Sequence, residues 1–250
     1  MKNQLNHNLN EKIALLQLFF NDAKKIVFFS GAGISTESGI PDFRGPNGLY
    51  SQTYDNKRPE EILSHNNYIH HPELYFKFFF EKKVFLDAKP NQAHLAIAKW
   101  QETKDIKVVT QNVDNLHQLA GSKTVYELHG SNYRMYCWKN HHQYNLLDVI
   151  KMKGDAIIPI CPEDGSNIRP DVILFGEPLK QDVLENAVKA INEADLIIVG
   201  GTSLLVYPAA GLINYMNPKA KLVIINYQPE NIICDLQINA KLGDVLSLIK

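Results

Sequence analysis

Cysteine is scarce in this chain of 250 residues, which contains three, Cys137, Cys161 and Cys234. The polar N-terminal residues do not read as a secretory signal. An odd number of cysteines without an export signal argues against a disulfide framework. Two interpretations remain open for these thiols, which are metal binding and burial.

Long apolar runs and an excess of charge are also missing. No stretch reaches the ~18 apolar residues that a membrane span needs. The formal net charge is −1 and the isoelectric point is about 6.8, so the chain lacks the basic surface typical of nucleic-acid or anionic-membrane binding. We expect a cytoplasmic protein with neither nucleic acid nor membrane among its partners.

Short β-branched runs alternate with helix-like segments along the chain. The strand-like runs cover residues 26–29, 107–110, 195–199 and 221–225, and the helix-like segments cover 10–23, 91–103, 180–193 and 208–216. Runs that are apolar on both faces are typical of parallel strands covered by helices on both sides. The pattern predicts an α/β fold with a doubly wound, Rossmann-like parallel sheet, whose ligands bind beyond the carboxyl ends of the strands.

Two segments interrupt this alternation. Residues 46–90 contain an aromatic-rich helical stretch, and residues 131–170 are rich in Asn, His, Cys and Pro. We predict that both are insertions that together form a smaller lobe. The remaining residues, 1–45, 91–130 and 171–250, are then the nucleotide-binding domain.

The first strand-like run leads into a glycine turn, Gly31-Ala32-Gly33. Glycines after a strand let backbone N–H groups approach a phosphate, and the next helix presents its positive end to that anion. A plain strand-to-helix turn is the alternative, since short glycine turns are common. The Asp42-Phe43-Arg44 triplet that follows favours the nucleotide, because it adds an acid, an aromatic face and a cation.

Polar side chains also follow the later strands. Residues 110–117 read TQNVDNLH, His129 stands before a glycine, and small polar residues follow near 201–203 and at Asn226. Polar groups clustered behind buried strands must be hydrogen-bonded or solvated, which makes a binding role attractive. His129 alone is more often structural than a general base.

Six motifs in order carry a family resemblance. They read GAGIS with GIPDFRG, TQNVDNLH, ELHG, IRPDVILFGEPL and GTSLLVYPAAGL, and together they span roughly residues 25–230. The chain resembles the sirtuin family of NAD-dependent protein deacylases, and its intact TQNVD and LHG elements are similar to the bacterial deacetylase branch. The resemblance implies an enzyme that consumes NAD and an acyl-lysine protein or peptide, and releases nicotinamide, O-acyl-ADP-ribose and free lysine.

The resemblance also implies roles for individual residues in binding NAD. Asp42, Asn112, Val113 and Asp114 would hold nicotinamide, and His129 would be the general base, with Asn112 also assigned to catalysis. Phe43 would cover the site after nicotinamide leaves. The remaining NAD contacts, to the phosphates and the two riboses, would come from Gly31, Ala32, Gly33, Thr36, Arg44, Gln111, Gly201, Thr202, Ser203 and Asn226, with Asp244 a weaker candidate.

A β-prone run is expected to bind the substrate peptide. In sirtuins the corresponding segment pairs with the peptide backbone, and a loop that contains Val206 supplies the other side. The alternative is an ordinary sheet strand. The predicted strand comprises Val172, Ile173, Leu174, Phe175, Gly176 and Glu177.

The chain departs from the family at the zinc ribbon, which in many sirtuins has two CxxC pairs. Each pair has lost one cysteine, because Asn140 and Asp164 stand where the second thiols would be. Two thiolates alone are a poor tetrahedral site. One alternative is a site that joins Cys137 and Cys161 to Asp164 and one of His141 and His142; the interpretation we prefer at this point is a module that has lost its metal.

A second departure concerns the acyl group. Sirtuins that remove acidic acyl groups carry a Tyr-x-x-Arg pair in the helical insertion, and Phe76 and Phe79 align with it here. An aromatic pocket without a fixed cation should favour neutral acyl groups, acetyl first and longer fatty chains next. Lys77 is the residue that could contradict this expectation.

Two other functions remain open on the sequence. An NAD hydrolase or ADP-ribosyltransferase would use the same cleavage with another acceptor, and a silent sensor would only bind NAD. The intact substrate run argues against the first, and the set Asn112, Asp114 and His129 argues against the second.

Overall fold

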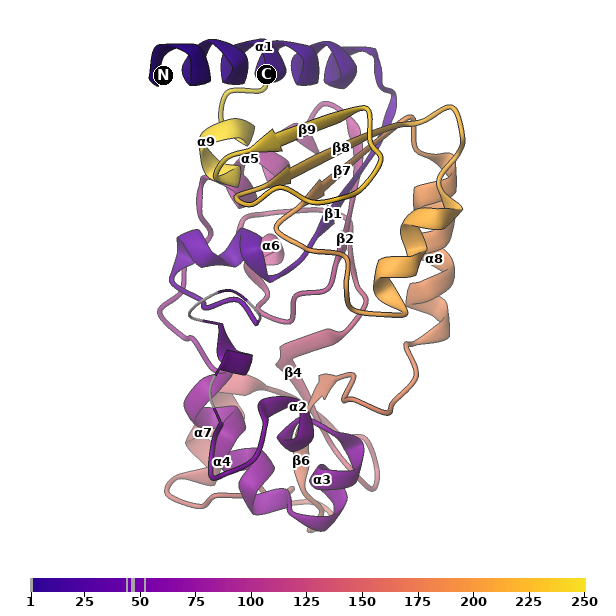
Figure 1. The fold of residues 1–250 in the computed structure, drawn as a ribbon. Coiled ribbons are helices and arrows are strands. Elements are labelled where there is room, and N and C mark those ends of the chain that lie inside the picture. Colours follow the sequence, from indigo (N-terminus) through magenta and orange to yellow (C-terminus); the bar gives the residue numbers. More distant parts are fainter. Residues whose placement is uncertain (1, 44, 46–47, 52) are drawn as a thin grey trace.

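A parallel sheet forms the upper part of the molecule in Figure 1. The computed structural model describes residues 2–43, 45, 48–51 and 53–250. Within them the sheet has six strands in the order β3-β2-β1-β7-β8-β9, all parallel. The strands are β1 (Lys25–Ser30), β2 (Asp105–Thr110), β3 (Val125–Glu127), β7 (Leu196–Gly200), β8 (Lys221–Asn226) and β9 (Leu236–Asn239).

Helices cover both faces of this sheet, which explains why its strands are apolar throughout. Phe28 and Ile198 belong to the core on one face, and their chain neighbours Phe29 and Ile197 belong to the core on the other. The first face is covered by α1 (Lys2–Asp22), α5 (Gln92–Trp100) and α9 (Leu242–Leu246), and the second by α8 (Gln181–Glu193) and the 3₁₀ helix η3 (Ala209–Tyr215). The predicted doubly wound α/β fold is confirmed.

The sequence prediction missed the two edge strands and the type of one helix. Strands β3 and β9 are the sheet edges; β3 has only three residues, and Gln237 and Asn239 interrupt the apolar pattern of β9. Edge strands have fewer buried positions, so their apolar signal is weak. Residues 209–215 form a 3₁₀ helix rather than the α-helix expected from spacing.

The lower part of Figure 1 holds an antiparallel sheet with short helices around it. A third core cluster joins Ile62 and Phe78 of the helical insertion to Met135 and Val149 of the later one. The boundaries of a smaller lobe stay a prediction. The elements here are β4 (Gly130–Cys137), β5 (Gln143–Asn145), β6 (Ile168–Val172), η2 (Leu49–Ser51), α2 (Pro59–Ile62), α3 (His65–His70), α4 (Pro72–Lys82) and α7 (Leu146–Lys153).

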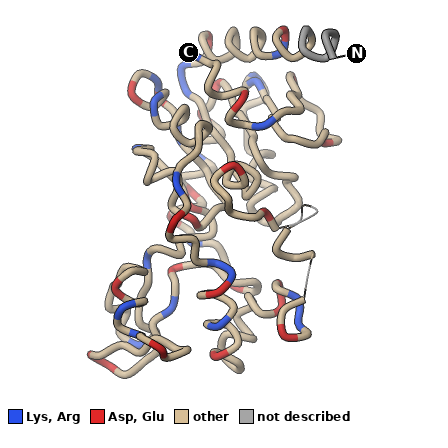
Figure 2. Tube along the Cα trace, turned by 90° about the vertical axis from the view of Figure 1, so that its left-hand side faces the viewer, with Lys and Arg blue, Asp and Glu red and all other residues tan. Residues whose placement is uncertain are grey.

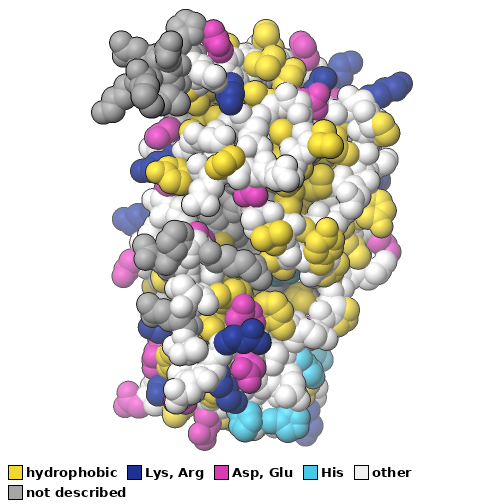
Figure 3. All heavy atoms as spheres, in the orientation of Figure 1, with side chains coloured by type: hydrophobic (Ala, Val, Ile, Leu, Met, Phe, Trp, Pro, Cys, Tyr) yellow, Lys and Arg dark blue, Asp and Glu magenta, His cyan; other side chains and the backbone are white. Residues whose placement is uncertain are grey.

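Charges of both signs are spread along the chain, as Figure 2 shows, and neither sign gathers on one part of the trace. Hydrophobic side chains gather at mid-height of the face in Figure 3, where the two sheet regions meet. Within the described residues, no helix is long and apolar enough to cross a membrane.

Candidate active site

Two turns of the parallel sheet meet at backbone distance. The turn after β1 leads into the 3₁₀ helix η1 (Ala32–Ser38), and the N–H of Gly33 donates to the carbonyl of Gly201, after β7, at 2.8 Å. A Cβ on Gly33 would lie 2.7 Å from the Cα of Gly201, and one on Gly31 would lie 2.6 Å from the Cβ of Thr202. The absence of a side chain at these glycines lets the two turns pack together, and their predicted contact with phosphate stays a prediction.

A cavity of about 660 Å³ lies against these turns at the carboxyl ends of the strands. This is the position where open α/β sheets bind nucleotides, at the point where the chain order reverses on either side of β1. Gly31, Asn112, Val113 and Asp114 do not line it, and Arg44 lies outside the described residues. The predicted NAD-binding residues that line it are Ala32, Gly33, Thr36, Asp42, Phe43, Gln111, Gly201, Thr202, Ser203 and Asn226.

A second cavity, of about 210 Å³, adjoins the first, because Ala32, Phe43, Gln111 and Val206 line both. In this cavity, residues predicted to bind nicotinamide and the predicted general base lie next to the segment predicted to bind the peptide. Its lining includes Asn112, Val113, His129 and residues 172–177.

A hydrogen-bonded chain of side chains stands behind the second cavity. The amide of Asn112 donates to the hydroxyl of Ser35 at 3.1 Å, and that hydroxyl donates to Asp114 at 2.6 Å. Asp114 also accepts the backbone N–H of Leu116 at 3.0 Å. Ser35 is 1% exposed and orients both neighbours through these hydrogen bonds. It was not among the predicted site residues, although it lies inside the glycine motif.

His129 is held at one ring nitrogen. Its Nδ1 lies 2.9 Å from the carbonyl oxygen of Gln111, which accepts a hydrogen bond and so places the proton on Nδ1. Burial lowers the pKa of His129 below its usual value, and the hydrogen bond to Gln111 opposes this only in part. The ring is therefore neutral at pH 7, with Nε2 as the basic atom.

The predicted peptide-binding strand is wrong in its bounds. Strand β6 ends at Val172, and Phe175 instead exchanges backbone hydrogen bonds with Leu63 and His65. The segment turns because Glu177 accepts the N–H of Leu174 at 2.8 Å and Gly176 takes φ +93°.

Arg169 stabilises this turn through hydrogen bonds. Its guanidinium donates to Glu177 at 2.8 Å and to the carbonyl of Val172 at 2.9 Å, and its side chain is 1% exposed. Burial would raise the pKa of Glu177, but the hydrogen bonds from Arg169 and Leu174 outweigh it and hold that pKa at about 2. This ion pair was not among the predictions from sequence, and it gives residues 172–177 a fixed shape.

The residues of α4 that line the second cavity correct one expectation. Tyr75 and Phe79 line the cavity, while Phe76 does not and packs on Tyr68 within the third core cluster. Tyr75, and not the predicted Phe76, is therefore the residue of α4 that lines the cavity with Phe79. Lys77 is exposed and lies over the Tyr54 ring, whereas Lys83 lines the cavity beside the Phe43 ring.

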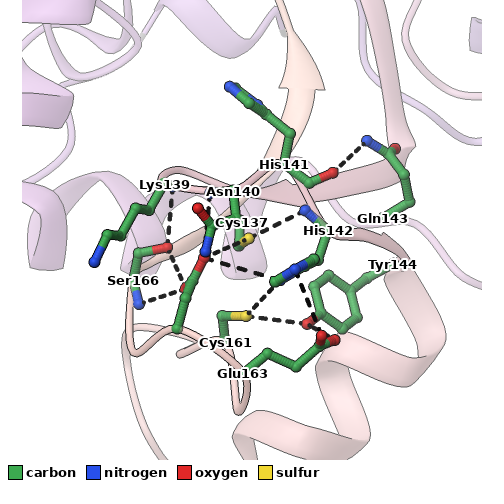
Figure 4. A network of polar contacts seen from close by, with 11 residues as sticks. Cys137, Lys139, Asn140, His141, His142, Gln143, Tyr144, Cys161, Glu163 and Ser166 are labelled. Carbon is green, nitrogen blue, oxygen red and sulfur yellow. Dashed lines mark hydrogen bonds and ion pairs between the residues drawn. The ribbon is translucent and has the colours of Figure 1, made fainter.

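Four possible metal ligands meet between β4 and the loop before β6. The side chains of Cys137, His142, Cys161 and Asp164 bring one ligand atom each within 4.8 Å of the others. Asp164 lies 3.1 Å from the sulfur of Cys137, and Nδ1 of His142 lies 3.6 Å from the sulfur of Cys161. Figure 4 shows His142 pointing into this group and His141 pointing away from it. Two thiolates, an imidazole and a carboxylate form a donor set that suits tetrahedral zinc.

The open parallel sheet has one cavity where its chain order reverses and a neutral histidine in the adjoining cavity. These features define a dinucleotide-binding α/β enzyme. Comparison with known proteins makes the class specific. The chain matches the Sir2 family over residues 31–208 and belongs to it.

Similar proteins and structures support this assignment. A protein from Clostridium acetobutylicum named NAD-dependent protein deacetylase is 48% identical, covering 96% of this chain and 99% of that protein. A protein of the same name from Thermotoga maritima is 45% identical, covering 82% of this chain and 83% of that protein. A solved structure described as Sir2 with a p53 peptide and NAD+ has a TM-score of 0.83 and 40% identity, with 94% of this chain and 95% of that chain covered.

We expect Gly33→Ala to weaken NAD binding by about tenfold or more, because its Cβ would push the turn away from the Gly201 backbone at a cost of about 1–3 kcal/mol. Isothermal titration calorimetry measures the affinity. Gly211→Ala is the control, since its Cβ would meet only the Tyr207 ring, at 3.4 Å. Equal affinities in the two variants would contradict the packing role of Gly33.

Proposed function

We propose that this Sir2-family chain removes acyl groups from lysine side chains of proteins and consumes NAD in the reaction. The amide bond to lysine breaks, the acyl carbon bonds to a ribose oxygen, and one water is used. The products are nicotinamide, O-acyl-ADP-ribose and free lysine. The observation that carries the proposal is the joining of His129, Asn112 and the 172–177 segment in a cavity that adjoins the dinucleotide cavity.

NAD supplies an activated ribose carbon, from which nicotinamide leaves. We assign the larger cavity to its phosphate and adenosine parts, because small residues and hydroxyls from several turns line it. Asn112 and the backbone of Val113 would bind the nicotinamide amide in the smaller cavity, with Asp42 in the adjoining larger one. Ser35 and Asp114 orient Asn112 through the hydrogen bonds described above.

His129 would act as the base. With Nδ1 committed to Gln111, its Nε2 can accept a proton from a ribose hydroxyl. The same Gln111 donates from its side chain to Thr202 at 3.2 Å, so one residue links the base to the dinucleotide cavity. Phe43 lines both cavities and would exclude water where they join.

The peptide would enter between residues 172–177 and Val206. Main-chain pairing along an extended segment depends little on side chains, so we expect broad sequence tolerance. A solved Sir2 structure with a propionylated peptide has a TM-score of 0.83 and 38% identity to this chain, with 94% of this chain and 95% of that one covered. We also propose a cytoplasmic location, which agrees with the three free cysteines of the chain.

His129→Ala should lower deacetylation by at least about 100-fold, since the base is lost, while NAD still binds. The assay is mass spectrometry of products from NAD and an acetyl-lysine peptide, with calorimetry for NAD. Wild type should yield O-acetyl-ADP-ribose. Free ADP-ribose alone would indicate a hydrolase and unchanged NAD a binding protein, and full activity of the variant would exclude His129 as the base.

The pH profile gives a second test of His129. Its pKa is lowered in the folded protein, so the neutral base persists at pH 7 and is lost only as the pH falls through that lower pKa. We therefore expect kcat/KM to be constant near neutral pH and to decrease as the pH is lowered beyond about 6.5. An acid limb centred above pH 7 would contradict this assignment.

We further propose that Cys137, His142, Cys161 and Asp164 hold one zinc ion as a structural site, which the sequence alone did not favour. Four ligand side chains at this spacing leave no open position for chemistry.

Metal analysis of the purified protein should find about one equivalent of zinc, the number that a closed four-ligand site binds. His142→Ala should lose the metal and lower the melting temperature, because binding free energy contributes to folding. His141→Ala is the matched control and should keep the metal. Wild-type protein without metal would refute the site.

A further inference from the structure

The ring of Phe43 lies at the border of the two cavities, where an aromatic and a cationic side chain contact it. Phe43 lines both cavities. The Tyr50 ring packs against it with 5.1 Å between the centroids, and the N–H of Tyr50 donates to the carbonyl of Phe43 at 2.8 Å. Lys83 follows α4 directly, and its ammonium lies over the Phe43 ring, 4.2 Å from the centroid.

Lys83 meets this ring as a cation without an ion pair. Among the described residues, no carboxylate lies within ion-pair distance of its ammonium. Glu177, whose carboxylate belongs to the same cavity wall, is paired with Arg169 instead. An aromatic face attracts a cation most strongly where water is scarce, so the ring of Phe43 is the favourable partner of this ammonium.

The charge of Lys83 changes close to neutral pH. Burial lowers the pKa of Lys83 to about 8, and the charge of Asp114, after β2, opposes this only in part. His129 is neutral at pH 7, and burial raises the pKa of Tyr75, so its phenol keeps its proton. The ammonium therefore predominates at pH 7 and is lost as the pH rises through about 8. The other titratable side chains that line this cavity are Tyr50, Glu177 and Tyr207.

The position of the Phe43 ring bears on a competition between two acceptors. After nicotinamide leaves, the ribose carbon can bond to the acyl oxygen of the peptide, which leads to O-acyl-ADP-ribose. If water reaches that carbon first, the carbon bonds to the water oxygen, a proton is released, and free ADP-ribose forms. A ring held at the border of the cavities excludes this water and favours acyl transfer.

We infer that Lys83 is a positioning residue, which holds the Phe43 ring at the border of the two cavities and thereby limits the share of NAD that is lost to hydrolysis. The inference rests on the proposed function and adds to it a residue that lies outside the sequence motifs. Lys83 acts through the ring of Phe43 and takes part in no bond change.

Nuclear magnetic resonance can observe the contact without turnover. In protein labelled with carbon-13 at lysine Cε, the Lys83 protons at this carbon should be displaced upfield by the Phe43 ring current and should titrate near pH 8. Lys83→Met identifies the signal by removing it. Phe43→Leu should abolish the displacement and lower the pKa of Lys83, because the ring stabilises the charged form. A signal that Phe43→Leu leaves in place would overturn the contact.

The coupling of the reaction gives a functional test. With NAD and an acetyl-lysine peptide, the nicotinamide released in excess of deacetylated peptide measures hydrolysis. Lys83→Met keeps the length of the side chain and should raise this excess by about fivefold to tenfold at pH 7, because the cation is lost. Lys83→Arg keeps the cation and should restore the wild-type value. Lys82→Met, at the exposed neighbour, is the matched control and should leave the excess unchanged.

The pH dependence of this excess separates charge from packing. In wild-type protein the excess should rise as the pH passes about 8, where the ammonium loses its proton. Lys83→Arg should stay at the low level, because a guanidinium remains charged. Lys83→Met should stay at the high level at every pH.

Separate outcomes overturn the inference and the proposed function. Equal coupling in wild type and Lys83→Met would show that the ammonium does not position the ring. A loss of coupling that Lys83→Arg does not restore, and that does not change with pH, would assign the effect to packing and refute the role of the charge. Wild-type protein that releases no deacetylated peptide would refute the proposed function itself, while the resonance experiment still decides whether Lys83 holds the Phe43 ring.

Discussion

The close approach of two backbone turns is the constraint on which the site depends. Parallel neighbours β1 and β7 end side by side, and their turns meet where Gly33 donates to Gly201. No side chain fits between them, as the contacts of a Cβ at either glycine demonstrate. The dinucleotide cavity forms beside this contact, so a change there alters the cavity walls on two strands at once.

Gln111 links these turns to His129 through hydrogen bonds. It follows β2, the other neighbour of β1, and its backbone carbonyl holds His129 while its side chain reaches Thr202 beyond β7. The carbonyl of His129 in turn accepts the N–H of Ile173, in the 172–177 segment, at 3.0 Å. A short series of hydrogen bonds thus connects Thr202, His129 and Ile173, to which we assign the contacts with the dinucleotide, the base and the peptide.

Much of the sheet and of the dinucleotide site could be predicted from local patterns. The buried runs at β1, β7 and β8 were found because both faces of a central strand are apolar, and the polar turns after them were found because parallel strands end at one edge. The edge strands β3 and β9 were not found, since one is short and the other is half polar. The predicted strand at 172–177 failed because Arg169 and Glu177 bend a β-prone segment into a turn, and an ion pair between an internal strand residue and a loop leaves no periodic signal.

The sequence by itself determined the family resemblance, and with it the class of chemistry, because the motifs that carry the resemblance are local: a glycine turn, an amide and an acid behind a strand, and a histidine before a glycine. Only the tertiary structure decided which side chains from distant segments meet. The phase of α4 turned Tyr75 rather than Phe76 toward the cavity, and the end of that helix delivered Lys83 to the Phe43 ring. Packing around β4 likewise brought His142 and Asp164 close to the thiols of Cys137 and Cys161. These contacts depend on the rotation of helices about their axes and on long-range packing. The energy of that packing is a sum over the whole core and is not encoded at any one position.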